Sequence, residues 1–490
     1  MNLDYEKLGF KAGLEIHQQL DANKLFCNCP SVLRSDDPKF IIKRNLHAVA
    51  GESGMIDIAA KFQVDKKMNY FYEGYDTTCL VELDEEPPHK INQDALKIAI
   101  EISLLLNCKI IPVTQIMRKT VINGSNTSGF QRTVMIAQNG HIKTSKGKVG
   151  INFILLEEDS ARKINALNTT QNSKHDDKKR ETYRLDRLGL PMVEVVTAPD
   201  IKDAKHAQEV ALKIGDILRS CKVRRGIGTI RQDINISILG ENRVEIKGMQ
   251  NMDIFVKTIE EEILRQKKLS DLGKPTKMEV RNANLDATTN FLRPLPGSAR
   301  MYPETDVELL HIKRNFINEI KKNLPKLKSE IEDELKTQGL SEEIIKMIFK
   351  QNKFNIYREL INTGATPKLI SKILFLFPKE ISKKEKKNLS EVEEILNKEV
   401  LLFVLEALRK EKIQEGDLKV VLGKIISGVP LKDSIKLDKK DLVGIEEEIM
   451  KIIREKPGLR PNAYMGLIMK KFGGAVSPQE VMEIIKGLLK

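Results

Sequence analysis

Acidic, amide and basic side chains alternate with apolar ones in three short segments of the chain. These segments are residues 13–20 (GLEIHQQL), 231–238 (RQDINISI) and 243–247 (RVEIK). Successive side chains of a β-strand point to opposite faces, so the polar members of each segment are predicted to share one face of a sheet. The polar members with useful chemistry are Glu15, His17, Arg231, Asp233, Asn235, Glu245 and Lys247.

Two further segments add carboxylates to this set. An apolar run ends in Glu157, Glu158 and Asp159, and Glu194 stands alone among β-branched residues. Carboxylate oxygens with one imidazole suit Mg²⁺ or Mn²⁺, and Lys and Arg neutralise phosphate oxygens that the metal does not cover. The residue types therefore suit a site that holds a hard cation and a phosphate together. Cross-strand ion pairs on a wet sheet face are the alternative.

Thiols and a turn-rich loop offer two more candidate sites. Cys27 and Cys29 have a short-loop spacing, and Cys79 is a third thiol far along the chain. They could form a zinc site with an unidentified fourth ligand, or pack as reduced core thiols. The loop at residues 123–132 (NGSNTSGFQR) contains Ser125 and Arg132 and could present backbone N–H groups to a phosphate.

Composition bounds the class of protein. The 490 residues are 41% hydrophobic and 31% charged, and the formal net charge of +13 suits a protein that holds a polyanion. No apolar run approaches the ~20 residues of a membrane span, and the first residues lack a signal-peptide core. We therefore expect a cytoplasmic protein with no membrane association. Five cysteines in so long a chain predict no disulfide framework.

The texture of the sequence changes twice along the chain. Residues 1–307 are rich in short β-like runs and glycine-bearing turns, which predicts an α+β domain built on antiparallel sheet. Residues 308–440 have apolar residues three and four apart, typical of an all-α helical domain. Residues 441–490 are predicted to form a small helical tail domain.

At these motifs the sequence resembles the GatB/GatE family, whose members convert a glutamate misacylated on glutamine tRNA into glutamine. The likeness follows the family's order and covers nearly the whole chain. It is carried by residues 13–17 (GLEIH), 24–29 (KLFCNC), 156–160 (LEEDS), 184–194 (RLDRLGLPMVE), 231–237 (RQDINIS) and 245–247 (EIK). Residues 83–89 (LDEEPPH) and 124–132 (GSNTSGFQR) are more similar to the archaeal E type (GatE) than to the bacterial B type (GatB).

The resemblance implies a fold, a reaction and partners. The first domain would be a cradle-like catalytic domain that uses ATP and Mg²⁺ to phosphorylate the glutamate side chain, after which ammonia displaces phosphate. The implied metal ligands are Glu15, His17 and a carboxylate of Glu157 or Glu158. Further ligands or ammonia-guiding groups would be Asp233, Asn235 and Glu245, with Arg231 and Lys247 on phosphate.

The same resemblance implies a separate source of ammonia, because no segment reads as a glutaminase nucleophile. For the E type that partner resembles an asparaginase (GatD), and two copies of each subunit would form a heterotetramer. Residues 441–490 would bind the body of the Glu-tRNA(Gln) substrate. One departure stands out: E-type chains usually carry an inserted domain, and the stretch from Lys267 to Leu295 has no room for it. A B-type subunit that also acts on Asp-tRNA(Asn), or a non-catalytic tRNA-binding assembly factor, remains an alternative.

Overall fold

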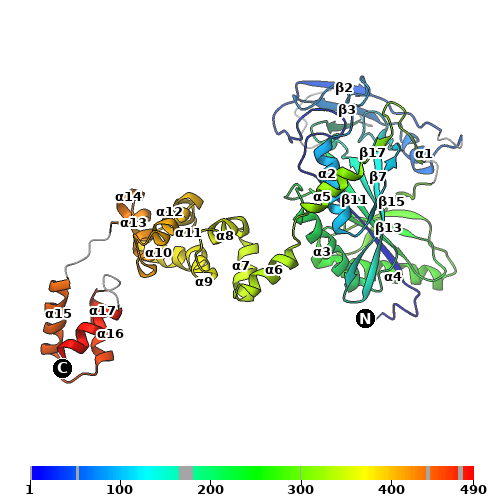
Figure 1. Ribbon diagram of the computed structural model, residues 1–490. Helices are drawn as coiled ribbons and strands as arrows, with labels where there is room; N and C mark the ends of the chain where they lie inside the picture. Colours follow the sequence, from blue (N-terminus) through cyan, green and yellow to red (C-terminus); the bar gives the residue numbers. More distant parts are fainter. Residues whose placement is uncertain are drawn as a thin grey trace. The chain divides into compact units, whose positions relative to one another are not determined.

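A computed structural model describes residues 3–50, 54–164, 180–297, 300–436, 442–472 and 478–489. The chain divides into two compact units, Met1–Lys328 and Ser329–Lys490. The first unit contains a large, mainly antiparallel sheet with helices, and the second is helical (Figure 1). The predicted α+β fold class with an all-α C-terminal part is therefore confirmed.

The central feature of the first unit is an eleven-stranded sheet. All of its strand pairs are antiparallel except β13–β14. In addition, β4 (Lys109–Ile110) pairs with β7. The order across the sheet is β15 (Thr289–Pro294), β14 (Glu279–Ala283), β13 (Val244–Lys247), β12 (Ile230–Ser237), β1 (Lys11–Gln19), β11 (Pro191–Thr197), β8 (Gly147–Glu158), β7 (Phe130–Thr144), β6 (Ile116–Thr120) and β16 (Met301–Pro303).

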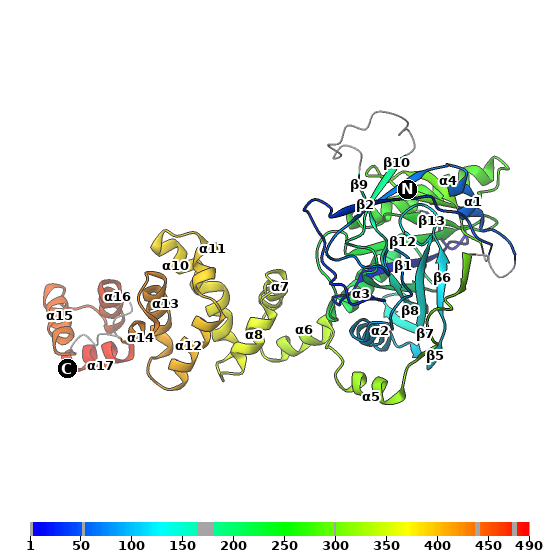
Figure 2. The same cartoon turned by 90° about the horizontal axis from the view of Figure 1, so that it is seen from above.

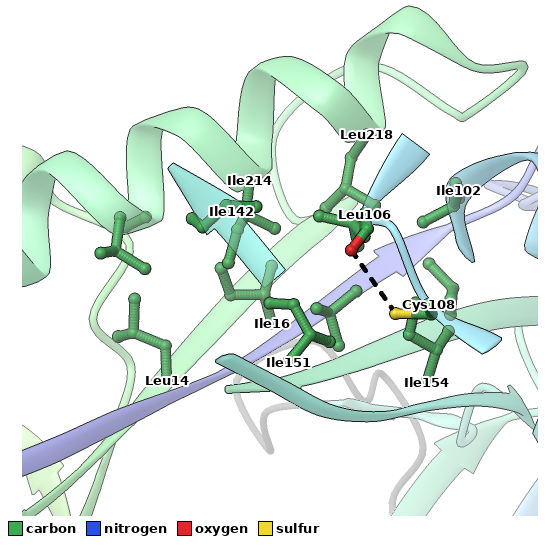
Figure 3. Close-up of a cluster of buried hydrophobic side chains, with 14 of the residues drawn as sticks. Leu14, Ile16, Ile102, Leu106, Cys108, Ile142, Ile151, Ile154, Ile214 and Leu218 are labelled. Carbon is green, nitrogen blue, oxygen red and sulfur yellow. Dashed lines mark hydrogen bonds between the residues drawn. The ribbon is translucent and has the colours of Figure 1, made fainter. Parts of the chain in front are cut away.

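Helices cover one face of this sheet. Contacts join α2 (Gln93–Leu105) to β7 and β8, α3 (Ala204–Ser220) to β1 and β7, and α4 (Met252–Asp271) to β12. Figure 3 shows Leu14 and Ile16 of β1 beneath Ile214 and Leu218 of α3, and all four side chains are buried. The apolar alternate positions of the strands thus form the core, and the polar alternate positions must lie on the opposite face.

The three covering helices begin at side chains that cap them. Asn92, Asp203 and Asn251 each accept a hydrogen bond from a backbone N–H in the first turn of α2, α3 and α4. Such caps satisfy donors that a helix start leaves free. The local sequence therefore fixes where each helix starts against the sheet.

A smaller sheet and several short elements complete the first unit. The order of the small sheet is β2 (Phe40–Arg44), β3 (Asn69–Gly74), β10 (Arg180–Arg184) and β9 (Arg162–Ile164). Figure 2 shows β2, β9 and β10 gathered together. The remaining elements are α1 (Ile58–Val64), α5 (Arg314–Lys322) and the paired strands β5 (Val113–Thr114) and β17 (Leu310–His311). Residues beyond 307 still belong to this unit, because Ile312 and Ile320 are buried in its core.

The second unit has two buried apolar clusters, one from residues 335–426 and one from residues 449–485. The three-domain division stays a prediction, and its boundary after residue 440 lies outside the described residues. Nowhere in the described ranges is a helix both long and apolar enough to cross a membrane. The helices are α6 (Lys328–Thr337), α7 (Glu342–Lys350), α8 (Phe354–Ile361), α9 (Pro367–Ser371), η3 (Lys372–Leu376), α10 (Phe377–Glu385), α11 (Leu389–Ile395), α12 (Lys398–Arg409), η4 (Glu415–Asp417), α13 (Leu418–Ile426), α14 (Leu431–Ser434), α15 (Leu442–Glu455), α16 (Pro461–Phe472) and α17 (Pro478–Leu488).

Candidate active site

Strand register brings the predicted polar residues together on the sheet face opposite the helices. Glu15 of β1 lies directly opposite Asp233 of β12, and Asn235 of β12 lies opposite Glu245 of β13. On the other side of β1, His17 lies opposite Glu194 of β11. Residues directly opposite each other in neighbouring strands share a face. The alternation predicted for β1, β12 and β13 is therefore confirmed.

The first acidic group consists of Glu15, Asp233 and Glu245, whose nearest carboxylate oxygens all lie within 4.8 Å of one another. Lys247 Nζ contacts Asp233 Oδ2 and Glu245 Oε1, each at 2.6 Å. Asn235 Nδ2 donates to Glu15 Oε1 at 2.8 Å. One lysine and one amide thus serve three carboxylates, which leaves the group short of positive charge.

Burial raises the pKa of Glu15, and the charges of Glu194 and Glu245 raise it further. Burial acts in the same sense on Glu245, but Lys247, Arg293 and Arg300 together outweigh it and lower the pKa of Glu245. Asn235 Oδ1 is buried and accepts no hydrogen bond from the described residues. An unpaired buried oxygen among crowded carboxylates is the donor set that a hard divalent cation takes, so these residues fit Mg²⁺.

The second acidic group consists of His17, Glu157 and Glu194, again with ligand atoms within 4.8 Å of one another. His17 Nε2 lies 3.6 Å from Glu194 Oε2. Lys119 Nζ of β6 lies 2.6 Å from Glu157 Oε1 and 3.2 Å from Glu194 Oε2. Gln131 Nε2 donates to the other oxygen of Glu157 at 3.2 Å. A lysine at the edge of this group is thus the counterpart of Lys247 in the first group.

The pKa values of the two carboxylates in this second group are shifted in opposite directions. Burial raises the pKa of Glu157, and the charge of Glu194 adds to this effect. Burial would also raise the pKa of Glu194, but Lys119 and His17 together lower it well below the ordinary value. Burial disfavours the imidazolium of His17, yet the charge of Glu194 raises the pKa of His17. A cation bound here would compete with protons for these groups, because metal ligands must be deprotonated.

Not every candidate from the sequence joins these two groups. Glu158 contacts Arg132 Nη1 at 3.4 Å, and Arg132 Nε donates to the buried Glu304 at 2.9 Å. Arg231 Nη2 lies 2.8 Å from the buried Asp159. The hydroxyl of Ser125 bonds to Asn123 Oδ1 and Asn126 Oδ1. Of the adjacent pair Glu157 and Glu158, only Glu157 thus faces the acidic groups, because neighbours on a strand point to opposite sides.

The predicted single metal set is also divided. Glu15 and His17 belong to different acidic groups, because β12 and β13 supply carboxylates on one side of β1 while β8 and β11 supply them on the other. No pattern in the sequence predicts a role for Lys119, because an isolated lysine in a short strand gives no signal. Glu194 gave one, since a lone carboxylate among β-branched residues is unusual in a buried strand.

The thiols of Cys27, Cys29 and Cys79 do come together, and Glu82 completes a group of four with ligand atoms within 4.8 Å of one another. Cys27 Sγ lies 2.8 Å from Glu82 Oε1, which also contacts the buried Lys24 at 3.2 Å. A hydrogen bond with Cys27 lowers the pKa of Cys79 to about 6. Ligands of a tetrahedral zinc site lie about 3.8 Å apart, so the four residues fit that metal.

Comparison with known proteins places this site in a family. Residues 10–318 match the GatB/GatE catalytic domain. The GatE-type chain of the glutamyl-tRNA(Gln) amidotransferase of Methanocaldococcus jannaschii is 36% identical over 526 residues, which cover 78% of this chain and 82% of that protein. Its counterpart in Methanothermobacter thermautotrophicus is 33% identical over 511 residues, with 76% and 80% covered. That of Methanococcus maripaludis strain C7 is 50% identical over 275 residues, which span 56% of this chain and 42% of its own length.

The lengths of these alignments bear on the expected missing insertion. The M. jannaschii alignment has 526 positions but uses only 78% of the 490 residues here, so that relative has residues with no counterpart in this chain. The stretch from Lys267 to Leu295, where the family's inserted domain was expected, contains only the end of α4 and the strands β14 and β15, which a short connection at residues 284–288 joins. This shorter chain belongs to the GatB/GatE family, and the relatives that it matches are archaeal GatE chains.

Proposed function

We propose that this chain is the transamidating subunit of a tRNA-dependent amidotransferase that converts Glu-tRNA(Gln) into Gln-tRNA(Gln). The observation that carries the proposal is the pair of adjacent acidic groups on one sheet face, each contacted by a lysine. A carboxylate resists attack by ammonia, so it must first be converted into a better acyl donor. Phosphorylation by ATP supplies that activation.

The proposed reaction has two steps. An oxygen of the glutamate side chain attacks the γ-phosphorus of ATP, the bond to the bridging oxygen breaks, and ADP leaves. Ammonia then attacks the resulting acyl phosphate at its carbonyl carbon, inorganic phosphate leaves, and the extra proton passes to a base. Both steps create charge on phosphate oxygens, so positioning and electrostatic stabilisation are the protein's main contributions.

Each acidic group has a part in this scheme. Mg²⁺ held by Glu15, Asp233 and Glu245, or by His17, Glu157 and Glu194, would neutralise phosphate oxygens and orient the nucleotide. Lys247 and Lys119 hold positive charge at the rim of the groups. Asn235 Oδ1, buried without a partner among the described residues, can accept a hydrogen bond from incoming ammonia.

The ammonia must come from elsewhere, and we propose an asparaginase-like glutaminase subunit (GatD) as its source. The names of the relatives describe one subunit of an amidotransferase, which implies an assembly. We propose a heterotetramer with two copies of each chain, working in the cytoplasm.

The C-terminal helices are the proposed contact for the body of the tRNA. Arg454, Lys456 and Arg460 are exposed in and beside the turn between α15 and α16. The hydroxyl of the buried Tyr464 donates to Lys456 O and accepts from Leu459 N, which holds this turn in place. A fixed, basic, solvent-facing turn suits contacts to a phosphate backbone by shape and charge.

We also propose a structural zinc ion on Cys27, Cys29, Cys79 and Glu82. The cluster joins the segment of Cys27 and Cys29 to the segment of Cys79 and Glu82. Leu25 N, beside the first segment, donates to Gly189 O, and Thr127 donates to Glu82 O in the second. The zinc ion would crosslink these two segments and would take no part in the reaction itself.

The decisive test supplies the purified chain with ammonium chloride, ATP, Mg²⁺ and Glu-tRNA(Gln), and identifies the amino acid released from the tRNA. Glutamine that forms only with ATP and Mg²⁺ is the expected result. Tight tRNA binding without glutamine would contradict the proposal and favour a non-catalytic tRNA-binding factor. Replacing the substrate by Asp-tRNA(Asn) tests the B-type alternative, and we expect no asparagine.

A further inference from the structure

The two outermost strands of the large sheet are joined by a very short connection. β15 ends at Pro294, β16 begins at Met301, and these strands lie at opposite ends of the strand order. A fully extended chain spans at most about 25 Å between those two residues. Ten strands side by side in a flat sheet would hold their edges about 43 Å apart. The sheet therefore curls, and its two edges approach each other on one side of it.

An arginine lies at each end of this connection. Arg293 of β15 pairs with Val280 of β14, which pairs with Glu245 of β13. Partners in such a row share a face, so Arg293 is on the same face as the first acidic group. The side of β14 that faces the helices is occupied by Glu279 and Arg281, which pair with each other and with residues of α4. This alternation agrees with Val280 and Arg293 facing the site.

Arg300 comes to the site from the other edge. Its Nε donates to Thr120 O at 3.3 Å, and the preceding residue, Lys119, contacts Glu194 of the second acidic group. Arg300 thus lies beside β6, near the opposite end of the strand order from β15, which carries Arg293.

These two arginines differ from the other arginines near the site because neither makes a close ion pair with a residue that the structure describes. Within the part of the chain that the structure describes, no carboxylate lies within 4.0 Å of Arg293 or Arg300, whereas Arg118, Arg132 and Arg231 each contact one. Arg293 Nη1 donates to Pro294 O, at 3.2 Å. Burial, followed by the like charge of Arg300, lowers the pKa of Arg293. The charges of Glu245, Asp57 and Asp233 act on Arg293 in the opposite sense, but none of these carboxylates is within contact distance. An anion that binds between the two half-buried arginines would therefore relieve their mutual repulsion.

We propose that Arg293 and Arg300 form a clamp for the phosphoryl group, gripping the γ-phosphate of ATP and then the phosphate of the activated glutamate. This inference rests on the proposed function and adds residues to it. A guanidinium presents its N–H groups as a planar fork that matches phosphate oxygens. A cation held by the acidic groups would neutralise the phosphate oxygens on one side. The clamp neutralises the oxygens that point away from that cation.

The other basic residues at the site are less available to bind a phosphate than Arg293 and Arg300 are. Lys247 and Arg231 are already engaged with carboxylates, so a phosphate that bound them would have to displace an ion pair. Arg293 and Arg300 need no such exchange. The curl of the sheet supplies the geometry, because only there can one arginine from each edge face the same ligand.

The experiment compares the full chain with its Arg293→Ala and Arg300→Ala variants in the ammonium-dependent glutamine assay. We expect kcat/KM for ATP to fall about tenfold to a hundredfold in each variant, the range of one lost hydrogen bond to a charged group. Affinity for Glu-tRNA(Gln), followed by filter binding, should stay within about twofold. Arg219→Ala removes an exposed arginine on α3 and serves as the matched control, with no expected change.

A direct binding measurement separates the clamp from the proposed function. Calorimetric titration with ATP and Mg²⁺ needs no amide formation, and both alanine variants should bind more weakly than the wild-type chain. Wild-type ATP binding that persists without glutamine formation would count against the proposed function alone. Unchanged ATP parameters in both alanine variants would overturn the clamp, and so would a selective loss of tRNA affinity.

If either alanine variant fails to fold, Arg293→Lys and Arg300→Lys keep the positive charge and remove the planar fork. These variants should fold, retain tRNA binding and show a raised KM for ATP. Lysine variants that match the wild-type chain would mean that the fork contributes nothing, which overturns the clamp.

Discussion

Glu15 and His17 lie two positions apart on β1 and face the same side, yet they belong to different acidic groups. Residues so spaced on a strand are about 6.8 Å apart, which leaves room for two neighbouring cation sites. Glu15 joins Asp233 and Glu245, whereas His17 joins Glu157 and Glu194. β1 thus contributes one residue to each group and separates the two.

Removal of either side chain should stop the chemistry while leaving the tRNA surface intact. Glu15→Ala and His17→Ala are each expected to lower the rate of ATP-dependent glutamine formation at least about a hundredfold, because the developing phosphate charge loses its stabilisation. Lys11→Ala changes an exposed residue of the same strand and is the control. A filter-binding titration checks tRNA affinity, and a large loss of affinity would make both residues structural.

The cluster of three thiols and Glu82 should bind about one zinc ion per chain. Inductively coupled plasma mass spectrometry measures the zinc content. Cys79→Ser should lose most of the metal and lower the melting temperature, because two loops lose their crosslink. Cys221→Ala changes a buried thiol outside the cluster and should keep its zinc. Metal content that is equal in the wild-type chain and Cys79→Ser would rule the site out.

Glu304 predicts a pH dependence of stability. It is fully buried and accepts from Arg118 Nη2 at 2.6 Å and Arg132 Nε at 2.9 Å. Burial opposes ionisation, but these contacts lower the pKa of Glu304 below its ordinary value. A lowered pKa means that the ion pairs stabilise the fold above about pH 4.3 and that this contribution is lost as the pH falls through the folded-state pKa.

Glu304→Gln should therefore lower the free energy of unfolding at pH 7 by about 2–4 kcal/mol, because two arginines lose their counter-charge. The difference from the wild-type chain should shrink as the pH falls below about 4. Urea denaturation at several pH values measures both quantities. Glu85→Gln, in an exposed pair with Arg44, should change stability by no more than about 0.5 kcal/mol. A pH-independent difference would show that lost packing, not charge, is the cause.

The basic turn of the C-terminal helices should contribute to tRNA affinity. Deletion of residues 441–490, or the double change Arg454→Ala and Lys456→Ala, is expected to weaken binding and to flatten its dependence on salt, since fewer counter-ions are released. Lys383→Ala with Lys384→Ala removes two cations of α10 as the matched control. Equal affinities for the double variant and the control at fixed salt would refute this role.

Much of the site could be predicted because the period of a strand is short and local. Leu14 and Ile16 are fully buried while Glu15 and His17 face away from the core, as alternation requires. The same rule placed Asp233 with Asn235 and Glu245 with Lys247. Their residue types indicated a hard cation and phosphate, and the family motifs in the same segments agree with that chemistry.

The alternation of side chains along a strand does not predict which strands lie side by side. The division of Glu15 and His17 between two groups depends on the order β12–β1–β11, which pairs residues that are far apart in the sequence. The choice of Glu157 over Glu158, and the roles of Lys119 and Glu82, depend on register and on a loop that returns to Cys27.

The sequence by itself determined the α+β class, the polar faces of the strands and the family, because these follow from periodicity and motifs within a few residues. Only the tertiary structure decided that the sheet curls until Arg293 and Arg300 approach from opposite edges. That convergence depends on the sum of pairings across the whole sheet, and such long-range contacts leave no local pattern in the chain.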